Sequence, residues 1–232
     1  MSAPESAQIF DATFSLNFED IRNTLSERGF CIIRNLFSKD CIADVNHQAD
    51  IYFSHPEVAG ASGYWKVDHP KALLNPFVLG GRTLELLLNH DIIEIVEGLM
   101  KSECILAESV VKQDYSTRYN YFPIHSDFSV GWNKSPKIKR TLQVSDMNEV
   151  LGIGGIVYLH DTSAGSFIYC DGTQKLKSTK GQRLTSYSND ERKLVLDRSV
   201  KCLGKRGDLV LFDDRGFHGP DFPSASNRRV IL

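Results

Sequence analysis

Two residues of suitable type for metal binding, His125 and Asp127, lie one residue apart in the sequence. In an extended segment residues i and i+2 point to the same face, so both side chains can reach one point in a protein interior. A third candidate, His218, follows the apolar stretch Gly207-Asp-Leu-Val-Leu-Phe. Two histidines and one carboxylate leave three coordination positions open, which suits iron(II) that binds a bidentate 2-oxo acid and then dioxygen. The pattern predicts a metal centre of His125, Asp127 and His218.

A histidine beside an aspartate is also a frequent surface or core arrangement, so the pair alone is weak evidence. The order of residues along the chain strengthens the prediction of a metal centre, because Arg228 and Arg229 follow His218 by about ten residues at the start of another expected strand. An arginine there could hold the distal carboxylate of a 2-oxo dicarboxylic acid through a bidentate fork. Strand alternation lets only one of the two arginines face inward, and both stay candidates.

The first third of the chain predicts helices and one early strand that would support this site. Residues Phe18 to Arg28 form an amphipathic pattern that ends at Gly29, and Phe30 to Arg34 read as a short buried strand. A second helix is expected to begin at Ser38-Lys39-Asp40, and a third to run from Leu84 to Met100. These segments are expected to pack against a sheet.

From Cys104 onward, strand patterns separated by turn residues replace the helical ones, as in a sandwich or barrel. A single domain over residues 1–232 is therefore expected, with a helical buttress and early strand in 1–103 and an antiparallel β core in 104–232. The expected strands of this core are Ile105–Val111, Thr141–Val144, Gly155–Leu159, Ser166–Tyr169, Leu194–Asp197, Asp208–Phe212 and Arg228–Leu232. The fold class is mostly β with helices.

Composition excludes several classes of partner. The formal net charge of -2 comes from dispersed charges, which gives no footprint for nucleic acid or an anionic membrane surface. The opening MSAPESAQIF has neither a basic nor an apolar leader region, so we expect a cytoplasmic protein without membrane spans. Five scattered cysteines without CxxC spacing indicate reduced thiols rather than a disulfide framework or a zinc knuckle.

The sequence resembles the phytanoyl-CoA dioxygenase-like family, which includes ectoine hydroxylase. The resemblance covers most of the chain. It is carried by Gly29-Phe-Cys-Ile-Ile-Arg-Asn-Leu-Phe-Ser38, His125-Ser-Asp127-Phe128, Gly155-Ile-Val-Tyr-Leu-His-Asp161-Thr-Ser-Ala-Gly-Ser-Phe-Ile-Tyr169, and Gly207-Asp-Leu-Val-Leu-Phe-Asp213 with His218 and Arg228.

The resemblance implies a double-stranded β-helix (jelly-roll or cupin-like) fold with Fe(II) as metal and with 2-oxoglutarate and O2 as cosubstrates. It favours Arg228 over Arg229 as the partner of 2-oxoglutarate, and it places Phe122 and Lys112 at positions that line that pocket in some relatives. The chain departs from the family at Cys170-Asp-Gly-Thr-Gln174, where relatives carry a Pro-Gly-Ser-His turn.

The implied activity is a dioxygenase reaction that hydroxylates a small-molecule substrate and releases succinate and CO2. Asp127 keeps a carboxylate where halogenating relatives leave room for chloride, so hydroxylation leads over desaturation or ring chemistry. Trp132, Phe128 and Tyr119 flank the metal motif as substrate-binding candidates or as core aromatics. A monomer or homodimer is expected. The alternatives are a cupin-like metal-dependent isomerase and a non-catalytic β-sandwich binding module.

Overall fold

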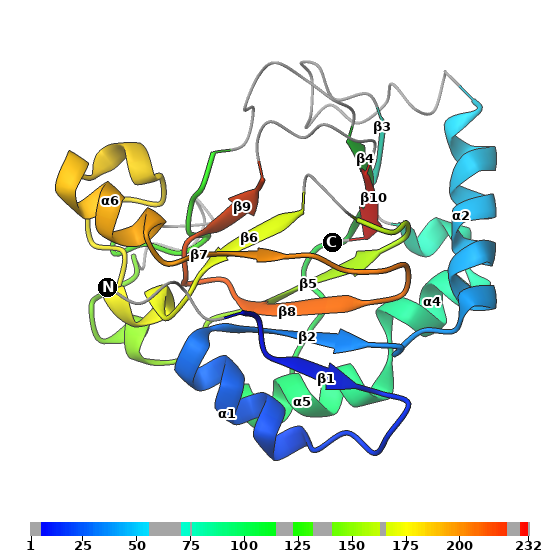
Figure 1. The fold of residues 1–232 in the computed structure, drawn as a ribbon, viewed down its shortest axis with the longest axis horizontal. Helices are drawn as coiled ribbons and strands as arrows, with labels where there is room; N and C mark the ends of the chain where they lie inside the picture. The colour runs from blue at the N-terminus through cyan, green and yellow to red at the C-terminus, as the bar shows by residue number, and fades with distance from the viewer. Residues whose placement is uncertain are drawn as a thin grey trace.

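The computed structural model describes residues 6–55, 71–74, 76–114, 123–131, 141–162, 166–221 and 228–231. Within these ranges two β-sheets face each other, and helices from the first half of the chain cover the outer side of the larger sheet (Figure 1). The fold is a mostly β jelly-roll core supported by N-terminal helices, as the sequence predicted.

Helix α1 (Phe18–Arg28) and strand β2 (Phe30–Arg34) have the predicted bounds. Asn17 begins the helix, since its side chain accepts hydrogen bonds from the backbone N–H groups of Glu19 and Asp20. Gly29 ends the helix at φ 85°, a left-handed conformation that glycine adopts without steric penalty. The tight turn at Gly29 leads directly from the covering helix into the sheet.

The other helices that cover the larger sheet are α2 (Lys39–Phe53), α4 (Gly81–Leu87) and α5 (His90–Met100). Ser38 caps α2 as predicted. The single helix predicted from Leu84 to Met100 is wrong, because Leu88 leaves the helical conformation and Asn89 begins α5 by accepting a hydrogen bond from the N–H of Ile92. The N-cap signal at Asn89 was missed because the apolar pattern continues across it.

The larger sheet has seven strands in the order β1-β2-β8-β5-β10-β4-β3, and the smaller has the order β7-β6-β9. Strands β1 (Ile9–Asp11), β2 and β3 (Lys71–Leu74) come from the first third of the chain. Their partners in the larger sheet are β4 (Val110–Asp114), β5 (Ile153–Tyr158), β8 (Leu209–Asp213) and β10 (Arg228–Ile231). The smaller sheet contains β6 (Phe167–Cys170), β7 (Ser199–Cys202) and β9 (His218–Pro220).

The two faces of the larger sheet bury different clusters. Val157, Leu209 and Leu211 alternate onto the face that packs against the helices. Ile156, Tyr158 and Phe212 alternate onto the face between the sheets, where they meet Phe167 and Tyr169 from β6. The site described below lies at the edge of this inter-sheet core.

Several of the predicted strands need correction. Residues Leu194–Asp197 were predicted as a strand, but they lie at the end of helix α6 (Asn189–Leu196), which begins with a capping box between Ser188 and Glu191. Residues Thr141–Val144 form no strand, and β4 begins at Val110, near the end of the predicted Ile105–Val111 strand. Strands β1, β3, β7 and β9, of three or four residues each, were not predicted.

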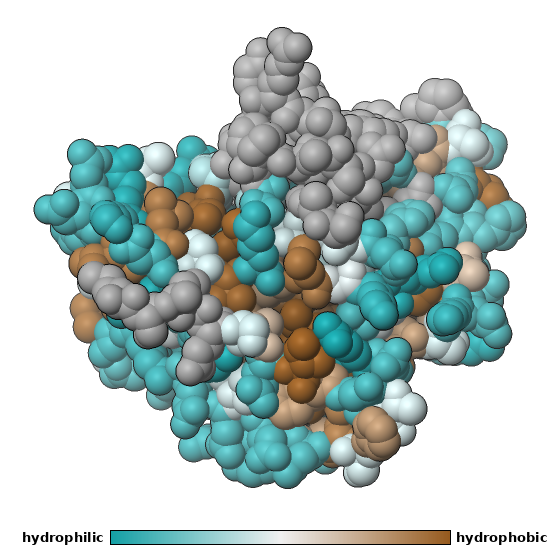
Figure 2. Space-filling model, viewed as in Figure 1, coloured by the Kyte–Doolittle hydropathy of each residue, from teal (hydrophilic) through white to brown (hydrophobic). Residues whose placement is uncertain are grey.

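All five cysteines are free, as predicted. Hydrophilic residues cover much of the described surface on the face shown in Figure 2, and hydrophobic residues gather in a band over the strands. Among the described residues, no helix combines the length and the apolar character needed to cross a bilayer.

Candidate metal centre

His125 and His218 are brought together by main-chain pairing. The N–H of His125 donates to the carbonyl of His218 over 2.9 Å, and the N–H of His218 donates back over 2.8 Å. His125 thereby continues the smaller sheet beyond β9 as an isolated antiparallel bridge. Because directly paired residues present their side chains on the same face, the two imidazoles lie side by side, with ring centroids 4.6 Å apart.

Backbone carbonyls orient both rings. Nδ1 of His125 lies 2.9 Å from the carbonyl oxygen of Pro123, and Nδ1 of His218 lies 3.0 Å from that of Gly216. A carbonyl can only accept, so Nδ1 donates in each ring, and in the neutral imidazole Nε2 then keeps its lone pair. This arrangement prepares an imidazole to ligate a metal through Nε2.

Asp127 completes the group. Its carboxylate oxygens lie 3.3 Å from Nε2 of His125 and 3.4 Å from Nε2 of His218. One ligand atom from each of the three residues lies within 4.8 Å of the others, which is close enough to share one ion. The Asp127 side chain is 44% exposed whereas that of His218 is 6% exposed, so the group opens toward solvent on the aspartate side.

Charges within the group shift its pKa values in opposite directions. Burial lowers the pKa of His125, and Asp127 offsets this only in part. Burial acts the same way on His218, but the charge of Asp127 outweighs it and raises the pKa of that ring. Burial raises the pKa of Asp127 less than the two imidazoles lower it, so the carboxyl is held well below its usual range and stays ionised.

Aromatic rings from the inter-sheet core enclose His218. Its ring centroid lies 4.6 Å from that of Phe212 and 5.6 Å from that of Phe167, and the ring of Tyr169 is parallel to it at 6.4 Å. The hydroxyl of Tyr169 donates to the carbonyl of Asp213 over 2.9 Å. These contacts fix the position of His218 and keep water from its buried side.

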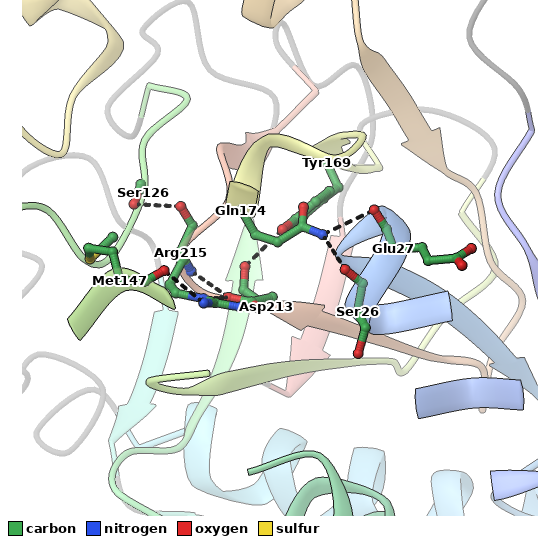
Figure 3. A network of polar contacts seen from close by, with 8 residues as sticks. All are labelled: Ser26, Glu27, Ser126, Met147, Tyr169, Gln174, Asp213 and Arg215. Carbon is green, nitrogen blue, oxygen red and sulfur yellow. Dashed lines mark hydrogen bonds and ion pairs between the residues drawn. The ribbon is translucent and has the colours of Figure 1, made fainter. Parts of the chain in front are cut away.

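A buried ion pair supports the loop between β8 and His218 (Figure 3). The guanidinium of Arg215 binds both carboxylate oxygens of Asp213 and donates to the carbonyl of Met147 over 3.0 Å. The carbonyl of Arg215 accepts from the hydroxyl of Ser126 over 3.1 Å, and Ser126 stands between the ligands His125 and Asp127. The N–H of Asp127 also donates to the carbonyl of Asp214. The loop that leads to His218 therefore holds the segment from His125 to Asp127 in place.

The residues just before His218 orient its imidazole through the main chain. The Nδ1 acceptor is the carbonyl of Gly216. Asp213 accepts instead from the side chain and the N–H of Arg215. Gly216 is required there because a Cβ atom would lie 1.8 Å from the hydroxyl of Tyr169.

The remaining predicted site residues fall into three groups. Tyr119, Phe122 and Trp132 lie outside the described residues. Phe128 is half-buried, with its ring edge 3.2 Å from where a Cβ on Gly152 would stand, and Lys112 is buried in β4. Arg228 and Arg229 form the start of β10, paired with Asp114 and Gln113.

Two residues beside the metal motif were missed by sequence reasoning. The side-chain amide of Gln182 donates to the carbonyl of Asp127, and Arg183 forms an isolated bridge with His125. They lie in a loop between β6 and α6 that has no strand pattern of its own. The only signal in the sequence is a run of cations without acidic residues between Asp171 and Asp190.

Fold and site together define a jelly-roll protein with a candidate His-Asp-His metal centre at the edge of its smaller sheet. No family model matches the sequence, and no curated protein does. The fold is nevertheless shared with solved structures, which confirms the predicted resemblance at the level of architecture.

Three of these structures show the extent of the likeness. EctD from S. alaskensis, solved with 2-oxoglutarate and 5-hydroxyectoine, superposes with a TM-score of 0.67 at 15% identity over 99% of this chain and 78% of its own. The same protein with bound Fe gives 0.67 at 17% identity over 99% and 79%. AviO1 from Streptomyces viridochromogenes Tue57 gives 0.64 at 16% identity over 94% of both chains.

Proposed function

We propose that this protein is an Fe(II)- and 2-oxoglutarate-dependent dioxygenase that hydroxylates an unactivated C–H bond of a small molecule. The observation that carries the proposal is the convergence of two Nε2 atoms and one carboxylate oxygen within 4.8 Å, with both Nδ1 atoms already bonded to backbone carbonyls. The likeness to the fold of EctD, solved with Fe and with 2-oxoglutarate, supports it.

The donor set fits iron(II). Two histidine nitrogens and one carboxylate oxygen, without a thiolate, would hold the ion and leave coordination positions for the cosubstrate and O2. When bound, iron(II) would supply the oxygen chemistry, in which one atom of O2 enters the substrate and the other enters succinate as 2-oxoglutarate loses CO2. The protein contributes ligand geometry, cosubstrate orientation and exclusion of water.

The register of the larger sheet supports a cosubstrate site. Val230 pairs with Lys112 on one side and with Tyr158 on the other, so this row belongs to the inter-sheet face of Tyr158. Lys112 is 5% exposed. In a regular strand, residues two apart lie on the same face of the sheet, so Arg228 is in phase with Val230. Arg229 is in phase with Ile231, which pairs with Val157 of the helix-side core.

This register favours Arg228 over Arg229 as the residue that binds the distal carboxylate of 2-oxoglutarate. Lys112 would add a second positive charge to the same face, as the resemblance implied. A guanidinium fork fixes the direction of a carboxylate, so such an arginine would orient the cosubstrate. Orientation of this kind lowers the entropic part of the reaction barrier.

Anaerobic titration of the metal-free protein with Fe(II) and 2-oxoglutarate tests the proposal. A weak visible charge-transfer band is expected only when both are present, and succinate should form once O2 is admitted. Metal binding without the band and without succinate would favour the cupin-like isomerase. No metal binding at all would favour the non-catalytic binding module.

A further inference from the structure

Arg183 lies directly opposite the metal-ligand candidate His125 in an antiparallel pair. The N–H of Ser126 donates to the carbonyl of Gln182 over 2.9 Å, and the N–H of Leu184 donates to the carbonyl of Ile124 over 3.4 Å. These two hydrogen bonds flank the pair of His125 and Arg183 without passing through it. In such a non-hydrogen-bonded pair the Cα atoms are about 4.5 Å apart and the side chains are close.

The two faces of this strand pair are clearly distinguished. Leu184 and Phe217 are buried in the cluster beneath α6, and Ile124 packs against the same cluster. Alternation places their neighbours Arg183, His218 and His125 on the opposite face. The guanidinium of Arg183 therefore belongs to the face that carries the metal ligands.

This guanidinium has no hydrogen-bond or ion-pair partner within the described part of the chain, and the residue is exposed. The carboxylate of Asp127, two residues from His125, is held between the imidazoles of His125 and His218. An arginine beside a carboxylate would ordinarily pair with it. Here Asp127 faces the two imidazoles instead, and the five donors of Arg183 stay available to a ligand.

The surrounding loop strengthens the positive charge. From Gly172 to Asn189 the chain contains no Asp or Glu and includes Lys175, Lys177 and Lys180 besides Arg183. Lys180 forms an ion pair with Glu191 of α6, which ties the loop to the helix. The loop near the metal centre therefore attracts anions.

We propose that Arg183 binds an oxyanion, a carboxylate or a phosphate, of the substrate that is oxidised at this centre. The inference rests on the proposed function, because it names the class of substrate for the same site. The proposed function gives the cosubstrate's distal carboxylate to β10 and β4 of the larger sheet, whereas Arg183 pairs with His125 at the edge of the smaller sheet, so Arg183 serves a different anion. Since it pairs with a ligand residue, its distance to the metal is set by the strand pairing.

The test uses inorganic phosphate as a probe with protein loaded with Mn(II), recorded first without 2-oxoglutarate and then at saturating 2-oxoglutarate. Paramagnetic broadening of the 31P resonance reports phosphate held near the metal, and a parallel titration follows the 13C carboxyl resonance of acetate. Wild type is compared with Arg183→Gln, with Arg183→Lys, which keeps the charge but loses the fork, and with the control Arg206→Gln. Arg206 is an exposed arginine that precedes β8 at the end of that strand opposite Asp213.

Saturable broadening is expected in wild type and in Arg206→Gln. Affinity should fall about tenfold or more in Arg183→Gln, as loss of a charge-assisted bidentate contact predicts, and less in Arg183→Lys. The anion that binds more tightly identifies the group that the substrate carries.

Three results would overturn the inference. The first is the absence of broadening in wild type. The second is equal broadening in Arg183→Gln, which would mean that phosphate ligates the metal. The third is broadening that 2-oxoglutarate abolishes, which would assign Arg183 to the cosubstrate. Failure of the proposed function would give a different result, in which phosphate binds through Arg183 but 2-oxoglutarate is not converted to succinate. If Mn(II) does not bind, the metal centre is contradicted, and calorimetric titration with phosphate still decides the role of Arg183.

Discussion

The main chains of His125 and His218 donate hydrogen bonds to each other, over 2.9 and 2.8 Å, so two residues 93 positions apart form one rung of the smaller sheet. Strand pairing therefore sets the separation of the two imidazoles before any ion binds. A site held in this way is preorganised, because the entropic cost of bringing the ligands together is part of folding and does not oppose metal binding.

Alanine substitution of any of the three ligand candidates should abolish metal binding and leave the fold in place. His125→Ala and His218→Ala keep the main-chain rung, and Asp127→Ala removes a carboxylate that is 44% exposed. Metal affinity by titration and secondary structure by circular dichroism give the two readouts. His47→Ala, at an exposed histidine on α2, is the control that should bind metal as wild type does. Unchanged affinity in one of the three variants would remove that residue from the centre.

Arg215→Met should destabilise the protein by about 3–5 kcal/mol, because it leaves the buried carboxylate of Asp213 without its partner. The two side chains are only 9% and 2% exposed. Chemical denaturation measures the loss. Metal affinity should also fall, since outer residues that hold ligands typically change it by about 10-fold to 100-fold.

A double variant separates charge from packing in this pair. Asp213→Leu combined with Arg215→Met removes both charges, so its free energy of unfolding should exceed that of Arg215→Met alone. If the double variant is as unstable as the sum of the two single variants, the ion pair is not the source of the effect.

Gly216→Ala should destabilise the protein by about 1–3 kcal/mol and weaken metal binding, because the new methyl group overlaps a packed ring. Its Cβ would stand 1.8 Å from the hydroxyl and 2.4 Å from Cζ of Tyr169, and Gly216 also supplies the carbonyl that orients His218. Gly155→Ala is the matched control, since its Cβ would meet Leu209 at an ordinary 3.5 Å. Equal thermal midpoints for the two variants would contradict the predicted overlap.

The capping box of α6 predicts a pH dependence. Lys180 and Ser188 lower the pKa of Glu191 from 4.5 to about 2. Since the pKa is lower in the folded protein, the stabilisation is present above 4.5 and is lost as the pH falls toward about 2. The difference in thermal midpoint between wild type and Glu191→Gln should shrink across that window. A constant difference would show that the charge of Glu191 does not contribute.

The sequence by itself determined the elements whose signals are local. Asn17 and Ser38 cap α1 and α2 because their side-chain oxygens bond to nearby N–H groups, and Gly29 ends α1 because it accepts a positive φ. His125 and Asp127 could be singled out because two residues of a short segment share a face whatever the fold. His218 and the arginine pair came from position along the chain and from resemblance.

Tertiary structure decided the rest. Leu194–Asp197 is an exception that was missed although its signal is local, because the capping box of Ser188 and Glu191 marks the start of the helix that it ends. The support of Ser126 by Arg215 and the position of Arg183 beside His125 both come from segments far apart in sequence. The carbonyls that orient the two rings are local, since each lies two residues before its histidine. The partner of a loop without a hydrophobic period cannot be predicted from the sequence of the loop, because the hydrogen bonds that place it are formed by backbone groups that every residue possesses.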